Sequence, residues 1–286
     1  MKVLKEGVFE GERALYASRD LTVADSVFRN GESPLKESRN LEITGCIFEW
    51  KYPLWYCEGV KVTDSTLLTT ARSGIWYTRG ISMENCTIDA PKTFRRSSDI
   101  SLKSCTMPNA QESFWGCEGI RLRSVSASGD YFAMNARNID IDGFSLSGNY
   151  AFDGAEGVRI KNARLISKDA LWNCRNVTVE DSVIIGEYIG WNSENIRLVN
   201  CTVQSEQGFC YMTGVELVNC KLINTDLAFE YSNVNADVKS SIKSVKNPIS
   251  GVIRADRIDE LIMESERVDV SATEIVTECE REKWRI

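Results

Sequence analysis

A repeat of about 19 residues dominates this sequence and limits what it can fold into. Residues 175–184 read RNVTVEDSVI, and residues 194–203 read ENIRLVNCTV. We take the first aliphatic residue of each such motif as an anchor. The twelve anchors are Leu21, Leu41, Val60, Ile81, Ile100, Ile120, Ile139, Val158, Val177, Ile196, Val215 and Val234. The intervals between them are 20, 19, 21, 19 and 20 residues and then six times 19 residues. A constant period of this length is typical of a solenoid, whose turns stack on one another.

Each repeat contains the pattern of short strands separated by turns. The residue two positions after an anchor is again apolar, with a polar residue between, which predicts a strand with one buried face. The residue before each anchor is always Asn, Asp or Gly. The fourth residue after each anchor from Leu41 to Val215 is Gly, Asn, Asp or Ser, as turns with positive φ require. A second strand follows the latter turn, and a third lies about five residues before the next anchor. We therefore predict an all-β fold, a single-stranded right-handed parallel β-helix solenoid of about 12 coils of 19–21 residues with three short strands per coil.

The ends of the repeat predict the domain organisation. A solenoid needs caps, because its terminal coils expose unpaired strand edges. We expect one domain over residues 1–286, with an N-terminal cap at 1–12, regular coils over 13–235, and a closing coil with a C-terminal cap at 236–286. The residue two positions before each anchor alternates in charge for much of the chain, beginning Arg39, Glu58, Arg79. In a parallel stack, this alternation would favour the correct register.

Composition excludes several classes of function. The net charge of −7 and the pI near 5.0 argue against a nucleic-acid or anionic-membrane partner. Histidine is absent, which removes Ser–His or Cys–His nucleophiles and the commonest metal ligand. The ten cysteines form no CxxC pair and no signal peptide or membrane span is evident, so we expect reduced core thiols, no zinc site and a cytoplasmic location.

Aromatic residues concentrate on the third strand and predict a binding face. The side-chain parity of this strand is open. In the favoured interpretation, the column that contains Trp55, Trp76 and Trp115 faces inward with a column of small residues. The outward residues are then Tyr52, Tyr56, Tyr77, Phe94, Arg96, Tyr131, Asn135, Tyr150, Asn173, Tyr188, Asn192 and Tyr211. Aromatic rings stack on the apolar faces of sugars, although the same rings could simply stabilise the sheet.

Charged residues on this face are candidates for chemistry. Asp169, Glu187, Glu206 and Asp226 follow on four successive coils, so neighbouring backbones should lie about 5 Å apart. Carboxylates this close suit a general acid with a partner base or nucleophile, or Ca²⁺ at Asp169, Glu187 and Glu206, but a solvated acidic edge is the simpler alternative. Asp153 and Arg95 interrupt the aromatic column. Arg95 and Arg96 would suit a uronate carboxylate, and a structural ion pair is an equal alternative for Arg95.

Several segments resemble a known family. GESPLKES (31–38), WKYPLWY (50–56), GIWYT (74–78), APKTFRR (90–96), SKDALWN (167–173), GEYIGWNS (186–193) and NTDLAFEYS (224–232) are similar to a bacterial family catalogued only as a domain of unknown function. The coil pattern resembles the pectin-lyase-like superfamily of right-handed β-helices, which consists mainly of polysaccharide enzymes. The resemblance implies a carbohydrate ligand, although the Asp-rich polygalacturonase motifs are missing.

Two functions follow as hypotheses. The first is a carbohydrate-binding or carbohydrate-active β-helix whose partner is a short oligosaccharide or glycoside. Its catalytic version is a glycoside hydrolase or lyase that uses Asp169 and Glu187, with Asp130 or Asp153 nearby. The sugar-binding residues would be Tyr56, Tyr77, Arg95, Arg96, Tyr131, Asn135, Tyr150, Asn173, Tyr188, Asn192 and Tyr211. The second is a non-catalytic scaffold or protein-binding solenoid.

Overall fold

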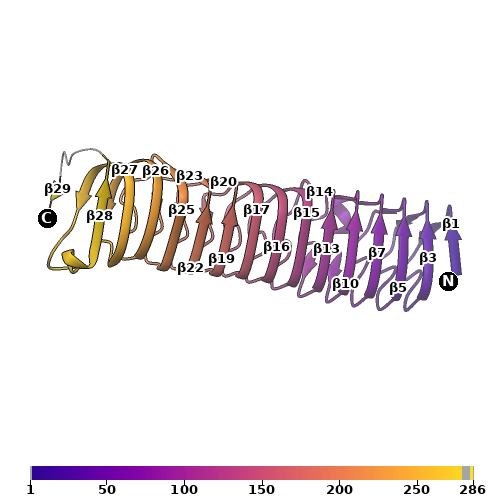
Figure 1. Ribbon diagram of the computed structural model, residues 1–286. Coiled ribbons are helices and arrows are strands. Elements are labelled where there is room, and N and C mark those ends of the chain that lie inside the picture. The colour runs from indigo at the N-terminus through magenta and orange to yellow at the C-terminus, as the bar shows by residue number, and fades with distance from the viewer. Residues whose placement is uncertain (1, 279–283, 286) are drawn as a thin grey trace. The chain divides into compact units, whose positions relative to one another are not determined.

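The computed structural model describes residues 2–278 and 284–285, and the chain forms two compact units, residues 1–147 and 148–286. Each unit is a stack of parallel strands wound around an apolar interior (Figure 1). Within the described residues, no helix has the length and apolar character needed to cross a membrane. The part of the chain that the structure describes contains two short 3₁₀ helices, η1 (Thr69–Ala71) and η2 (Val270–Ala272).

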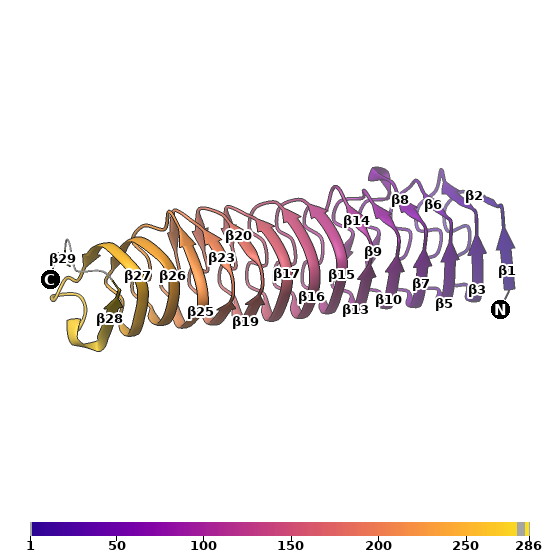
Figure 2. The same cartoon turned by 45° about the horizontal axis from the view of Figure 1, so that its top comes forward.

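In the first unit, two sides of every turn are strands (Figures 1 and 2). The first side is formed by β1 (Lys2–Lys5), β3 (Arg19–Ala24), β5 (Arg39–Thr44), β7 (Glu58–Thr63), β10 (Arg79–Glu84) and β13 (Ser98–Lys103). The second side is formed by β2 (Val8–Glu10), β4 (Val27–Arg29), β6 (Ile47–Phe48), β8 (Thr66–Leu67), β11 (Thr87–Ile88) and β14 (Thr106–Met107). Two longer strands run along both sides, β15 (Glu118–Ser128) and β16 (Arg137–Ser147), and the third side holds only β9 (Ile75–Trp76) and β12 (Phe94–Arg95).

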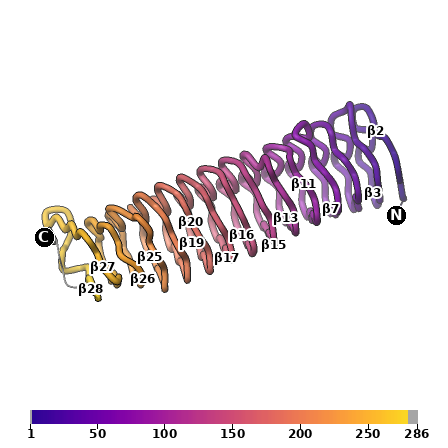
Figure 3. Tube along the Cα trace, turned by 90° about the horizontal axis from the view of Figure 1, so that it is seen from above, coloured from indigo at the N-terminus to yellow at the C-terminus, as the bar shows by residue number. Residues whose placement is uncertain are grey.

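The second unit repeats this plan, and successive loops of its chain trace are visible in Figure 3. Strands that run along both sides are β17 (Glu156–Ile166), β25 (Thr213–Ile223), β26 (Asn233–Lys246) and β27 (Ser250–Ile262). Single-sided strands are β19 (Arg175–Glu180), β22 (Glu194–Val199) and β28 (Thr273–Thr277) on the first side, and β20 (Val183–Ile185), β23 (Thr202–Gln204) and β29 (Trp284–Arg285) on the second. The third side holds β18 (Asp169–Ala170), β21 (Tyr188–Ile189) and β24 (Gln207–Gly208).

The register of the paired strands confirms that equivalent residues of successive repeats are neighbours in space. Val177 pairs with Ile196, and Ile196 pairs with Val215. In the first unit, Leu41 pairs with both Leu21 and Val60. Within each unit, the stack therefore places each anchor on the next, as the period of 19 residues predicts.

The predicted turn columns are also confirmed. The residue before the anchor has positive φ at Asp20, Asn40, Asp99 and their equivalents, except Asn233. The column four residues after the anchor has positive φ from Asp25 to Asn219. Left-handed backbone is costly for most L-residues, and Asn, Asp and Gly tolerate it best. These residues turn the chain from one side of the solenoid to the next.

The interior is filled by columns of identical or similar side chains. Phe9, Phe28 and Phe48 stack with ring centroids 5.0 and 4.7 Å apart, and Phe94 stacks on Phe114 at 4.5 Å. All of these rings except Phe9 are almost fully buried. A parallel stack brings like residues together at every turn, so aromatic columns gain stacking energy as well as buried area.

Two sequence predictions need correction. The number of coils is larger than twelve, because β1 and β2 pair with β3 and β4, so the segment expected as an N-terminal cap forms a further turn. At the other end, β27 and β28 continue the stack beyond β26, and residues 279–283 and 286 of the expected C-terminal cap lie outside the described residues. The third strand of the coil is also shorter than predicted. It is two residues long in β9, β12, β18, β21 and β24, and a turn takes its place in the other described coils. The handedness of the coil stays a prediction.

The alternating charge column forms some of the expected ion pairs. Arg39 and Glu58 lie 3.5 Å apart, as do Arg175 and Glu194. Arg79 pairs instead with Asp99 at 3.3 Å. All of these groups are well exposed, and exposed pairs contribute only a few tenths of a kcal/mol each.

Candidate functional site

The third side departs from strand alternation, and this decides which aromatic residues face solvent. Tyr56 and Tyr77 have positive φ of 55° and 57°. The side chain of each Tyr therefore points outward, as does that of the Trp before it, whereas consecutive residues of a regular strand would point to opposite sides. Trp55 and Trp76 are half-buried, whereas the residues before them, Leu54 and Ile75, are fully buried. The favoured interpretation, in which the Trp column faces inward, is therefore wrong. The small column is buried as expected, but Phe94, expected outside, is completely buried.

The outward Trp rings stack mainly on one another. Trp55 and Trp76 are parallel, with centroids 5.2 Å apart and an interplanar angle of 8°. Tyr56 and Tyr77 form a second stacked pair at 4.8 Å. The indole N–H groups of Trp55 and Trp76 donate to the carbonyls of Ser73 and Lys92 in the following turn. Since the faces that a sugar would use are occupied by neighbouring rings, this ladder serves to stabilise the stack.

Arg95 takes the place of a Trp in the same ladder. Its guanidinium lies 4.8 Å from the ring centroids of both Trp76 and Trp115, and Nη2 lies 2.9 Å from Glu112. Cation–π contact and a charge-assisted hydrogen bond thus hold the side chain in place. Arg95 therefore forms a structural ion pair, which was one of its two predicted roles. Arg96 is exposed.

The amide groups expected to bind sugar are joined to one another along the second unit. Asn192 donates to Asn173 at 2.8 Å, and Asn173 donates to Asp153 at 2.7 Å. Asn135 is exposed in the first unit, and the tyrosines of the predicted set range from half-buried to exposed: Tyr131, Tyr150, Tyr188 and Tyr211. None of these residues lines the groove described next.

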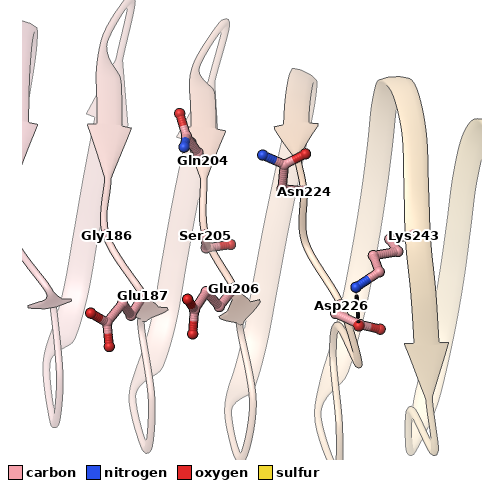
Figure 4. Close-up of a pocket in the computed structure, with 8 residues that line it drawn as sticks. All are labelled: Gly186, Glu187, Gln204, Ser205, Glu206, Asn224, Asp226 and Lys243. Atoms are coloured by element: carbon pink, nitrogen blue, oxygen red, sulfur yellow. Dashed lines mark hydrogen bonds and ion pairs between the residues drawn. The ribbon is translucent and has the colours of Figure 1, made fainter.

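A polar groove of about 520 Å³ lies on the second unit, on the side where the chain passes from the second strand to the third (Figure 4). Gly186 admits close approach of the preceding turn, because a Cβ there would lie 2.1 Å from the carbonyl oxygen of Ser167. The lining brings together carboxylates, amides, a hydroxyl and an amine from successive turns: Gly186, Glu187, Gln204, Ser205, Glu206, Asn224, Asp226 and Lys243.

Two of the three carboxylates in the groove have lysine partners. Lys168 Nζ lies 3.2 Å from Glu187, and Lys243 Nζ lies 2.6 Å from Asp226. Burial by itself would raise the pKa of Asp226, but hydrogen bonds from Lys243 and Ser244 outweigh it and hold the pKa below its usual value. Asp226 is therefore ionised at neutral pH.

Asp169, one of the predicted catalytic carboxylates, is 3 % exposed and is absent from the groove lining. Its Oδ1 has no hydrogen-bond partner within the described part of the chain. Burial raises the pKa of its carboxyl group, Lys168 opposes this shift, and Glu187 adds to it. Asp169 is thus a buried carboxyl beside the groove.

The other predicted carboxylates are dispersed. Asp153 accepts a hydrogen bond from Asn173, and Asp130 belongs to the first unit. Of the predicted catalytic residues, only Glu187 lines the groove. No group of three His, Cys, Asp or Glu residues among those described is arranged to hold a metal ion, so the Ca²⁺ alternative at Asp169, Glu187 and Glu206 has no support.

Half of the groove lining was not predicted from the sequence. Gln204, Asn224 and Lys243 come from the second side, where outward polar residues looked interchangeable, and Ser205 is buried beside them. Lys243 also follows a register shift between β25 and β26 and another between β26 and β27, so the repeat does not place it. No signal in one sequence distinguishes these residues from other solvated positions.

Comparison with known proteins identifies the family but no activity. A family described as "Protein of unknown function (DUF3737)" matches residues 2–276. No curated protein matches the chain. Solved structures of similar fold include PfbA, a surface adhesin of Streptococcus pneumoniae, with 10 % identity over 92 % of this chain and 81 % of that chain and a TM-score of 0.39. The A-module of the mannuronan C-5 epimerase AlgE4 of Azotobacter vinelandii has 11 % identity over 99 % and 88 % of the two chains and a TM-score of 0.32. These similarities are too low to carry an argument about function.

Proposed function

We propose that this chain, which belongs to the DUF3737 family, is a carbohydrate-binding protein that holds a short oligosaccharide or glycoside in the groove of its second unit. The observation that carries the proposal is the chemistry of the lining. Carboxylates, amides and a hydroxyl converge on a space of about 520 Å³. Such a volume falls in the range of small-ligand sites, about 300–1,000 Å³.

Unused hydrogen-bonding capacity in the groove supports this proposal. The side-chain amides of Gln204 and Asn224 form no hydrogen bond with the described residues, and each offers both donors and an acceptor. Sugar hydroxyls also donate and accept. The absence of an aromatic ring from the lining argues for modest affinity, because stacking would contribute nothing there.

Isothermal titration calorimetry with a panel of mono- and disaccharides tests the proposal. We expect saturable binding by at least one sugar, weakened about fivefold by Asn224→Ala, since a lost hydrogen bond costs about 1 kcal/mol. Asn235→Ala is the matched control, because Asn235 is an exposed amide of β26 that is absent from the groove lining. No binding by any sugar would contradict the proposal and favour the scaffold or protein-binding alternative.

A catalytic version of the same proposal is a glycoside hydrolase or lyase. The raised pKa of Asp169, which lies close to Glu187, resembles that of a general acid. Its support is weaker than that for binding, because Asp169 does not line the groove. Incubation of bound sugars with the protein, followed by detection of new reducing or unsaturated ends, tests this version.

We also propose a reducing compartment, consistent with the cytoplasm. Nine cysteines in the described residues are free and buried. Burial raises the pKa of several of these thiols, including Cys57 and Cys174 to about 12, so they are protonated at neutral pH. Protonated thiols are poor nucleophiles, which supports a structural role.

A further inference from the structure

We propose that the groove selects a sugar that carries an ammonium group, an amino sugar, over neutral and acidic sugars. This inference rests on the proposed function and adds the charge class of the ligand. Three carboxylates and one lysine line the groove. With the adjacent Lys168 included, one negative charge is still left without a counter-charge.

The ion pairs show which carboxylate is left over. Glu187 is paired with Lys168, and Asp226 is paired with Lys243. Glu206 lies on the turn between them and has no cationic partner among the residues that the structure describes. Figure 4 shows the Glu206 carboxylate beside that of Glu187, whereas Asp226 points toward Lys243.

The stack keeps Glu187 and Glu206 close whether or not a ligand is bound. The backbone N–H of Glu206 donates to the carbonyl of Glu187 at 2.9 Å, so the two residues occupy equivalent places on adjacent turns. Adjacent turns lie about 4.8 Å apart, and two carboxylates at that spacing repel each other. A ligand ammonium group placed at Glu206 would relieve this repulsion, and the amides of Gln204 and Asn224, at the other end of the groove in Figure 4, would be left for the sugar hydroxyls.

The same charges disfavour a uronate. A sugar carboxylate would meet three negative groups, and the lysine in the lining is already paired with Asp226. The basic residues of the first unit also have acidic partners, since Lys51 pairs with Glu32 while Lys92 and Arg95 share Glu112. The structure thus points away from acidic sugars.

Calorimetry with four ligands of similar size tests the inference: a glucosamine disaccharide, its N-acetylated form, cellobiose and a glucuronic acid disaccharide. At pH 6 and low salt, we expect the glucosamine disaccharide to bind about two- to fivefold more tightly than cellobiose, as one exposed ion pair allows. We expect Glu206→Gln to lower this ratio toward one. Glu274→Gln, which alters an exposed carboxylate of β28 outside the groove, should leave the ratio unchanged.

The outcomes separate the inference from the proposed function. Equal binding of cellobiose and the glucosamine disaccharide would overturn the charge preference and leave sugar binding intact. Binding of spermidine as tightly as the amino sugar would overturn the sugar class, because charge alone would then explain recognition. No binding by any sugar would remove both proposals. A ratio that Glu206→Gln leaves unchanged would show that another group recognises the ammonium.

Discussion

At the scale of single residues, backbone conformation decides which side chains reach the surface. Tyr56 and Tyr77 occupy left-handed conformations that cost an ordinary residue about 1–2 kcal/mol. Their rings stack on each other, and this contact offsets part of that cost. Local strain of this kind reverses the parity of the third side, so the Trp and Tyr columns both face outward.

Asp169 provides a residue-scale prediction with a pH dependence. Its pKa is raised by burial, so the native state binds its proton more tightly than the unfolded state does. The free energy of unfolding should therefore fall as pH rises above the ordinary carboxyl range. Asp169→Asn removes the cost of burying a charged carboxylate, and we expect it to raise the free energy of unfolding by about 1 kcal/mol at pH 7. This gain should shrink as the pH falls toward 4, where the carboxyl group of Asp169 is protonated.

Urea denaturation of the Asp169→Asn variant between pH 4 and pH 8 measures this effect. Glu274→Gln is the control, because Glu274 is exposed and should show little change at any pH. A loss of stability in the Asn variant at pH 7 would mean that the carboxylate has a favourable partner that outweighs its burial.

At the scale of the element, the corners between sides are closed by buried hydroxyl and thiol groups. Ser193 Oγ accepts from the backbone N–H of Cys174 at 2.8 Å and donates to the carbonyl of Leu171 at 2.8 Å. Cys57 and Cys174 donate in the same way to the carbonyls of Leu35 and Phe152. This explains why small columns contain Ser, Thr and Cys rather than Ala alone, since buried backbone groups need partners.

Replacement of Ser193 tests the corner. We expect Ser193→Ala to lower the free energy of unfolding by about 1–3 kcal/mol, because it leaves a buried N–H and a buried carbonyl without a partner. Ser193→Cys should cost less, since cysteine occupies the equivalent position at Cys174. Chemical denaturation measures both, with exposed Thr213→Ala as the control. Equal losses for Ala and Cys would indicate that volume, rather than hydrogen bonding, matters at this corner.

At the scale of the whole molecule, each unit behaves as a stack of equivalent turns. Nearly every strand pairs in register with the turns on either side, so the stability of a unit is approximately a sum over adjacent turns. The registers in the second unit are regular from β17 to β25, and shifts appear only at β26. The regular part should tolerate the loss of one complete turn.

Deletion of residues 181–199 tests this prediction. The deletion removes 19 residues and joins Glu180 to Asn200, the equivalent of Asp181 in the next turn. We expect cooperative unfolding and a β-type circular dichroism spectrum. Deletion of residues 181–190 should abolish cooperative unfolding, because it places polar columns in the interior. Equal behaviour of the two deletions would contradict a stack that depends on the period.

Much of the fold was predictable, because residues that contact one another in successive turns recur at a fixed interval in the sequence. Val177, Ile196 and Val215 recur at a fixed interval and lie on one another. Asn, Asp and Gly marked two turns, since few other residues tolerate positive φ. The third turn was not recognised, because Tyr56, Tyr77 and Arg96 adopt positive φ without belonging to those residue types.

The solenoid, its period and its buried columns follow from the sequence alone, because each depends on residue type at a regular spacing; the absence of histidine chemistry follows from composition. The stacking of the Trp rings on one another and the position of Arg95 between two of them become visible only in three dimensions. The tertiary structure also decided which carboxylate in the groove lacks a partner, since Lys168 pairs with Glu187 and Lys243 with Asp226. Charge pairing depends on side-chain directions across turns, and residue spacing alone does not specify those directions.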